Sequence, residues 1–223
     1  MKTEAERPAW RLRDVLIGVG VLIVWLLTVW FTANQVQGKL SPRAIQATSQ
    51  AAGAAVLLLA FIFMRYRRRL ESVGQVRSSL WLGIAIVVSL YVLQFAYAKL
   101  NSMPIEASMA QIRALDFASA DWMLVWLSAV VLAPVSEELL FRHHLLQLVP
   151  AESSRRWALV GVAATSVAFA YLHQQYFQPS TLLLMFLLAC TFGWLRLRSG
   201  RIAIPIGLHA VASIVALLLN QLR

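Results

Sequence analysis

Two adjacent glutamates lie inside an apolar segment that is long enough to cross a membrane. Glu137 and Glu138 occur within residues 122–142, where most of the other side chains are apolar. A charged side chain near the bilayer centre costs about 2.5–3.5 kcal/mol on insertion scales, so such groups pair, become protonated or face water. His173 and His209 add two ionisable groups in later apolar segments. This set of residues predicts chemistry that is carried out within a membrane.

The spacing of the charged residues gives the two glutamates different expected roles. On a helix, Glu138 and Arg142 are four residues apart, share a face and can form an ion pair. Glu137 points about 100° away from Glu138 and lacks that partner. We therefore expect Glu138 to be held by Arg142, and Glu137 to be free to take a proton as a general base. The alternative is a structural Glu–Arg clamp at a helix end near the cytoplasmic interface.

The two histidines have neighbours that could position them. Phe169 lies four residues before His173, so its ring can pack against the imidazole. The alternative for His173 is an ordinary interfacial histidine in a stretch rich in polar and aromatic residues. Ser213 lies one turn after His209 and can hydrogen-bond to whatever His209 contacts, and the two glutamates are the best partners in the chain for His209.

Two further histidines, His143 and His144, directly follow Arg142. Because they continue a basic stretch, we interpret them as interfacial residues and assign them no role.

Glutamate and histidine together can hydrolyse a peptide bond in two ways. A glutamate can take a proton from water while a histidine stabilises the hydroxide or a developing oxyanion. Alternatively, Glu137, His173 and His209 could hold a divalent metal such as zinc, as two imidazoles and a carboxylate do in hydrolytic zinc sites. Neither histidine belongs to an HExxH pair, the usual local signature of such a site. The cofactor is left open at this point, and none is required by the first mechanism.

The composition predicts an all-α, polytopic transmembrane helical bundle. Hydrophobic residues make up 60% of the chain and charged residues 13%, against about 25% charged residues in a soluble domain. Apolar runs without β alternation predict about seven spans. They cover residues 15–33, 49–64, 80–98, 122–141, 157–177, 180–195 and 202–222. An eighth span results if Pro134 divides the fourth run.

Loops rich in positive charge alternate along the chain with loops that carry little, which predicts how the protein is oriented across the membrane. The net charge of the chain is +10. The basic residues lie in short loops between apolar runs, which is typical of membrane proteins, so we expect a lipid bilayer and no nucleic acid as partner. By the positive-inside rule, the N-terminus is cytoplasmic and the C-terminus faces outward. The richest connections carry Arg7, Arg11 and Arg13; Arg65, Arg67, Arg68, Arg69 and Arg77; Arg142, Arg155 and Arg156; and Arg196, Arg198 and Arg201.

Three motifs resemble those of the CPBP family of intramembrane proteases. Residues 137–142, EELLFR, are similar to its EExxxR motif, and residues 169–173, FAYLH, to its FxxxH motif. His209 corresponds to the histidine of its HxxxN motif, although Ser213 stands where the family often has asparagine. The family includes CAAX prenyl protease 2 enzymes and bacterial bacteriocin-processing and immunity proteins of the Abi type. Whether a serine at this position preserves activity is left open.

The resemblance implies a membrane endopeptidase in which Glu137 activates water, with Glu138 and Arg142 orienting the site and His173 and His209 assisting. Its substrate would be a peptide or protein in or near the membrane, and the glutamic mechanism is favoured over the metal-dependent one. The expected organisation is residues 1–120 as transmembrane helices without recognised motifs and residues 121–223 as CPBP-like catalytic core helices, packed as one membrane domain. We expect a bacterial inner-membrane protein.

Two other functions stay open. The chain could be a non-catalytic membrane scaffold or bacteriocin-immunity factor that retains the fold, which the serine at position 213 favours. It could also be a small transporter or proton pathway, although it shows neither an inverted repeat nor paired broken helices.

One geometric conflict accompanies these predictions. With the expected spans, Glu137 lies roughly 8 Å from the cytoplasmic end of its helix, and His173 roughly 24 Å into its own helix from the same side. A shared site then requires tilted or broken helices, or a fifth helix that begins well below the hydrocarbon.

Overall fold

The computed structural model describes residues 12–63, 75–151 and 154–222, which fold into helices with no strand among them. The long helices are α1 (Leu12–Val36), α2 (Pro42–Phe63), α3 (Val76–Leu100), α7 (Arg155–Tyr171), α8 (Pro179–Ser199) and α9 (Ala203–Gln221). Between α3 and α7 lie the short helix α4 (Ala107–Arg113) and a longer segment that begins with α5 (Ala120–Trp126). The protein is thus the all-α helical bundle that the composition predicts.

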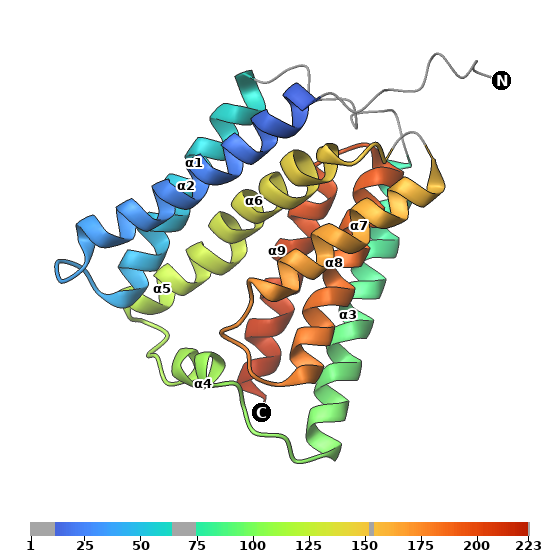
Figure 1. The fold of residues 1–223 in the computed structure, drawn as a ribbon. Coiled ribbons are helices and arrows are strands. Elements are labelled where there is room, and N and C mark those ends of the chain that lie inside the picture. The colour runs from blue at the N-terminus through green and yellow to red at the C-terminus, as the bar shows by residue number, and fades with distance from the viewer. Residues whose placement is uncertain (1–11, 64–74, 152–153, 223) are drawn as a thin grey trace.

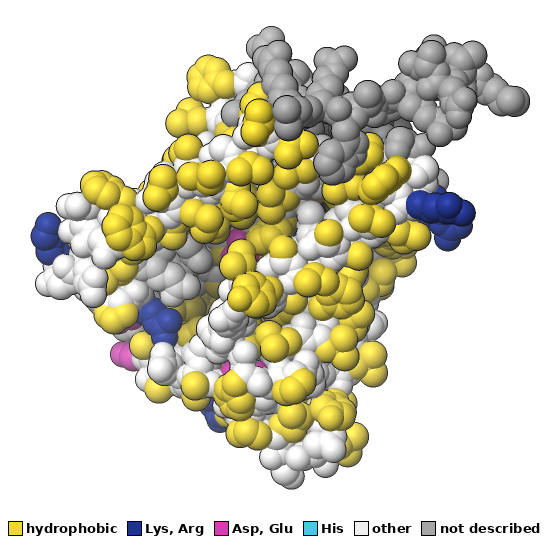
Figure 2. Space-filling view, in the orientation of Figure 1, with side chains coloured by type: hydrophobic (Ala, Val, Ile, Leu, Met, Phe, Trp, Pro, Cys, Tyr) yellow, Lys and Arg dark blue, Asp and Glu magenta, His cyan; other side chains and the backbone are white. Residues whose placement is uncertain are grey.

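Six helical segments among the described residues are long and apolar enough to cross a membrane. Large apolar side chains are exposed on their outer faces, for example Trp30, Trp81 and Leu100. Figure 2 shows apolar side chains over most of one face, with the Lys and Arg side chains near its edges. Because a soluble surface rarely exposes apolar patches of this extent, this surface is suited to lipid. The chain is an integral membrane protein.

Helix α7 differs from the predicted fifth span. We expected a span over residues 157–177, but α7 ends at Tyr171 and its 17 residues cover about 25 Å. That length is short of the roughly 30 Å hydrocarbon core. In Figure 1, α7 also runs at an angle across α8, and the chain then turns before α8 begins. The helix ends early because Leu172 to Gln175 form a turn before Pro179, which occupies the first turn of α8.

The segment that carries both glutamates is one helical rod, Ala120–Leu148. It contains α5, the π-helical segment η3 (Leu127–Leu132), α6 (Ala133–Glu138), the π-helical segment η4 (Leu139–Leu145) and the 3₁₀ turn η5 (Leu146–Leu148). In η3 the backbone N–H of Ala133 bonds to the carbonyl of Ser128, five residues earlier. This wider turn directly precedes Pro134, which has no N–H to donate. Pro134 therefore does not split the segment, and the structure shows no eighth span there.

The rod also extends past the predicted end of the fourth span at residue 141. Helices α1, α2, α7 and α8 contact η4, and they bury His143 and His144 completely. The prediction that these histidines are interfacial is therefore wrong. His143 Nδ1 lies 2.9 Å from the Gln147 side-chain nitrogen, and its ring contacts Phe61 edge-on at a centroid distance of 4.7 Å. The basic stretch does not end the helix here, and other helices pack around it.

The bundle surrounds the rod. Figure 1 shows α1 and α2 as a pair on one side and α3, α8 and α9 on the other, with α5 and α6 between them and α4 near the C-terminus. Helix α2 packs on α6, and α3 packs on both α8 and α9. The main buried cluster joins Leu139, Leu140 and Phe141 to residues of α8 and α9. Glu138, which is fully buried, thus directly precedes a part of the rod that belongs to the core.

The contact of α3 with α8 and α9 depends on Gly83. A Cβ at this position would lie 2.3 Å from Cδ1 of Leu208 and 2.8 Å from Cδ1 of Leu195, and both leucines are fully buried. We expect Gly83→Ala to destabilise the protein by about 1–3 kcal/mol through overpacking. Thermal unfolding in detergent measures this, with Gly20→Ala in α1 as the control, because a Cβ there meets nothing within 4 Å. Equal stability of the two variants would contradict the tight packing at Gly83.

The N-terminal orientation remains a prediction. Arg7, Arg11, Arg65, Arg67, Arg68 and Arg69, on which it largely depends, lie outside the described residues.

Candidate active site

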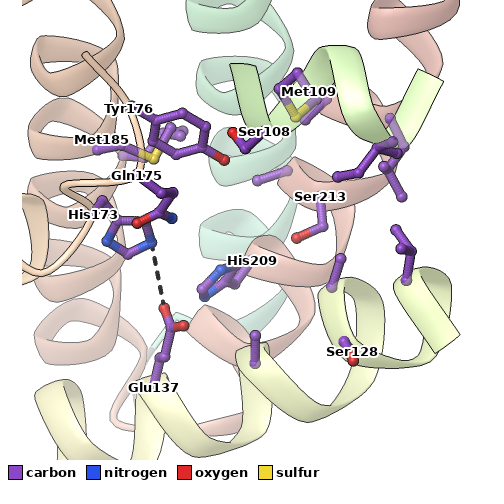
Figure 3. Close-up of a pocket in the computed structure, with 18 of the residues that line it drawn as sticks. Ser108, Met109, Ser128, Glu137, His173, Gln175, Tyr176, Met185, His209 and Ser213 are labelled. Carbon is purple, nitrogen blue, oxygen red and sulfur yellow. Dashed lines mark ion pairs between the residues drawn. The ribbon is translucent and has the colours of Figure 1, made fainter. Parts of the chain in front are cut away.

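A cavity of about 420 Å³ lies between α2, α4, the rod, α8 and α9. Its lining includes Glu137 from α6, His173 from the turn after α7, and His209 and Ser213 from α9. Figure 3 shows Glu137 directed toward His173, with His209 beside it and Ser213 one turn further along α9. The structure therefore brings together residues from three segments that are distant in the sequence.

Two features of the structure remove the expected difference in depth between Glu137 and His173: the length of the rod and the early end of α7. The rod continues for 11 residues beyond Glu137, to Leu148, which places Glu137 about 16 Å from that end and not 8 Å. His173 lies beyond the end of the short, inclined α7. As a result, Oε2 of Glu137 lies 3.8 Å from Nε2 of His173, and the two side chains are only 20% and 15% exposed.

Glu138 forms the ion pair that the spacing predicts. Its Oε2 lies 3.2 Å from Nε of Arg142, and neither side chain is exposed. The Arg142 guanidinium also donates to the carbonyl oxygen of Ala189 at 3.1 Å and lies 4.7 Å from the centre of the Phe169 ring. These contacts neutralise a buried carboxylate, and without them its burial would be costly.

The other oxygen of Glu138 contacts His209. Oε1 lies 2.9 Å from Nδ1 of His209, so Nδ1–H donates to the carboxylate that Arg142 holds. The His209 ring also stacks on Phe192 at a centroid distance of 5.6 Å with 23° between the planes. These two contacts fix the orientation of the ring, and they leave Nε2 as its second functional nitrogen.

His173 is oriented in a similar way by a backbone group. Its Nδ1 lies 2.7 Å from the carbonyl oxygen of Phe169, which can only accept, so Nδ1 carries the hydrogen. The Phe169 ring stacks on the imidazole at a centroid distance of 4.3 Å, as the four-residue spacing predicts. Nε2, the other ring nitrogen, faces Glu137.

The sequence did not single out the polar residues that line the rest of the cavity. Gln175 and Tyr176 come from the turn after His173, Ser108 from α4, and Gln46 and Gln50 from α2. The sequence pattern could have indicated the two α2 glutamines, because two amides four residues apart lie on the same face of an otherwise apolar helix.

Tyr176 lies against His173. The two rings are nearly parallel, 9° apart, with a centroid distance of 6.3 Å. Burial, with smaller contributions from the carboxylates of Glu137 and Glu106, raises the pKa of the Tyr176 phenol to about 12. The phenol is therefore a hydrogen-bond donor at neutral pH.

The arrangement does not fit a three-ligand metal centre. Among the residues that the structure describes, no group of three His, Cys, Asp or Glu side chains is placed to hold a metal ion. A catalytic zinc site requires three protein ligands around one point, so we derive no step through a metal.

Comparison with known proteins identifies the family. Residues 119–215 match the family described as type II CAAX prenyl endopeptidase Rce1-like. The chain is also 34% identical over 172 residues to an Escherichia coli protein described as an uncharacterized 24.3 kDa protein, covering 74% of this chain and 77% of that one. The chain belongs to the CPBP family of intramembrane proteases. No solved structure matches this CPBP protease.

The family match spans the rod, α7, α8 and most of α9, and so includes all three motifs. Membership supports protease activity of the CAAX type, and together with the membrane-spanning helices it indicates a membrane-associated substrate. Membership by itself assigns no role to any single residue of this CPBP protease.

Proposed function

We propose that this protein is a glutamic intramembrane endopeptidase in which Glu137 activates the attacking water. The observation that carries the proposal is the 3.8 Å approach of Glu137 Oε2 to His173 Nε2 at the wall of a cavity that His209 also lines. This separation is longer than a direct hydrogen bond and short enough for one water molecule to contact both atoms. Such a water would donate one hydrogen to each.

The reaction balances with these groups alone. Glu137 takes a proton from water as the water oxygen attacks the carbonyl carbon of the scissile peptide bond. A protonated His209 donates Nε2–H to the oxyanion of the tetrahedral intermediate, and the nearby Glu138 carboxylate balances its charge. Glu137 then returns the proton to the amide nitrogen as the C–N bond breaks, which releases a carboxyl and an amine product. Ser213 lies where its hydroxyl can support the same oxyanion.

Glu138 and Arg142 act through His209 in this mechanism. Arg142 pairs with the Glu138 carboxylate, and that carboxylate contacts Nδ1 of His209 and so orients the ring with Nε2 toward the substrate. The pair therefore has a positioning role, and Phe169 has a similar role for His173.

The substrate we propose is a peptide segment of a membrane-associated protein. Four side-chain oxygens that line the cavity are buried and have no hydrogen-bond partner in the described part of the chain. They are Gln50 Oε1, Ser108 Oγ, Ser128 Oγ and Glu137 Oε2. Buried polar atoms are normally paired, and a peptide backbone offers N–H groups to such oxygens.

Mass spectrometry of membranes tests this function. Peptides released from membranes that contain the wild-type protein are compared with those from membranes containing Glu137→Ala at equal protein level. We expect at least one peptide that depends on Glu137, and its end names the scissile bond. Identical peptide sets would support the scaffold or immunity interpretation in place of proteolysis.

Metal removal provides an independent prediction. Because the reaction uses Glu137 and two histidines without a metal step, treatment with 1,10-phenanthroline should leave turnover within about twofold of the untreated protein. Cleavage of the peptide identified above is measured with and without chelator, after dialysis to remove loosely bound ions. Loss of activity that added zinc restores would contradict the glutamic mechanism.

A further inference from the structure

A buried carboxylate outside the motifs binds the backbone next to the His173 turn. Glu106, the residue before α4, is 4% exposed. Its Oε2 accepts the N–H of Phe177 at 3.0 Å, and its Oε1 accepts the N–H of Gln178 at 3.1 Å. Each oxygen thus bonds a different amide, 71 and 72 residues away in the sequence. Charge-assisted bonds to backbone N–H groups are among the stronger hydrogen bonds in proteins.

A second bond runs in the opposite direction between the same two segments. The side-chain amide of Gln178 donates to the carbonyl oxygen of Pro104, and Gln178 is 3% exposed. Gln178 directly precedes α8, so the carboxylate of Glu106 also lies near the positive end of that helix dipole. Each segment therefore bonds the backbone of the other with a side chain of its own.

The bonded backbone is continuous with the turn that carries His173. The N–H of Tyr176 donates to the carbonyl oxygen of His173 at 3.1 Å, and the N–H of His173 donates to that of Ala170. Helix α7 therefore holds one end of the turn, and Glu106 holds the residues that follow the other end. Between them, the Tyr176 ring lies parallel to His173.

We propose that Glu106 is a positioning residue, whose hydrogen bonds to Phe177 and Gln178 keep Tyr176 and His173 in place opposite Glu137. The proposal rests on the proposed function, since it assigns His173 to the reaction. Without a carboxylate at this position the backbone N–H groups of Phe177 and Gln178 lose their shared acceptor, and Nε2 of His173 is held less firmly relative to Glu137.

Glu106→Gln tests the proposal with little change in size. The amide can accept one of the two N–H groups, but its NH₂ group faces the other donor. We expect kcat for the identified peptide to fall about tenfold or more, because small displacements of catalytic groups are costly, with KM within about twofold. Asp116→Asn is the matched control, since Asp116 is an exposed acid in the same connection that accepts the N–H of Ala118. It should leave both constants unchanged.

Hydrogen exchange separates positioning from a general effect on the fold. In purified protein, we expect Glu106→Gln to speed exchange at the Tyr176 amide as well as at Phe177 and Gln178, with exchange in α3 unchanged. Unchanged exchange at Tyr176, or a full kcat, would overturn the proposal. If the wild type shows no proteolysis, the exchange result still decides whether Glu106 holds the turn, and only the proposed function fails.

Gln178→Ala provides a second variant in case Glu106→Gln does not fold. It removes the bond to the Pro104 carbonyl and leaves both bonds to Glu106 in place. It should accelerate exchange at Tyr176 and lower kcat in the same direction but less. No change in either quantity would overturn the role of this contact.

Discussion

Glu137→Gln should lower turnover by about a thousandfold, since general-base catalysis contributes about 10²–10⁴-fold. Glutamine has nearly the same size as glutamate and can still contact water, but it cannot take the proton. The measurement is kcat of purified protein on the peptide that the membrane comparison identifies. Thermal unfolding of the same sample should show stability close to wild type, because Glu137 lines the cavity and, among the described residues, Arg142 is paired with Glu138 instead.

Asp116→Asn is the control for the loss of one negative charge. It should retain full activity, because Asp116 lies in an exposed connection away from the cavity. A Glu137→Gln protein that is folded and cleaves at more than about a tenth of the wild-type rate would show that another group activates water.

Arg142→Ala should have the largest effect on stability, about 3–5 kcal/mol. The substitution leaves the Glu138 carboxylate buried without its cation and removes the contacts of the guanidinium with Ala189 and Phe169. Chemical unfolding in detergent micelles measures the loss. Arg198→Ala is the control, because Arg198 is exposed and bonds Gln75 at the surface, so it should cost less than about 1 kcal/mol.

A double variant distinguishes the unpaired charge from lost packing. Glu138→Gln combined with Arg142→Met removes both charges and keeps similar volumes, so it should recover much of the stability that Arg142→Ala loses. It should remain inactive, because His209 then lacks the carboxylate that orients it. A double variant as unstable as Arg142→Ala would show that packing around the guanidinium, and not charge pairing, dominates.

Contacts within one helix turn could be predicted from the sequence. The pair Glu138 and Arg142 and the pair Phe169 and His173 are each four residues apart, and both contacts occur. Helical periodicity alone determines such neighbours. The contact of His209 with a glutamate was also expected, because few other polar partners exist in the apolar segments.

Contacts that depend on how helices end and cross could not be predicted. The basic stretch from Arg142 to His144 suggested a helix end, but α1, α2, α7 and α8 surround it, so the rod continues to Leu148. The early end of α7 was equally hidden, and it is what brings His173 to Glu137. Glu106 carried no signal because its partners are backbone N–H groups, which are the same for every residue type apart from proline.

Hydrolysis in ¹⁸O-enriched water tests whether Glu137 activates the water that attacks the peptide bond. Purified wild-type protein and Glu137→Gln are incubated with the identified peptide, and the products are analysed by mass spectrometry. We expect one ¹⁸O atom in the new C-terminal carboxylate formed by the wild type, and no product above background from Glu137→Gln. A wild-type product without ¹⁸O, or equal labelled product from both proteins, would contradict water activation by Glu137.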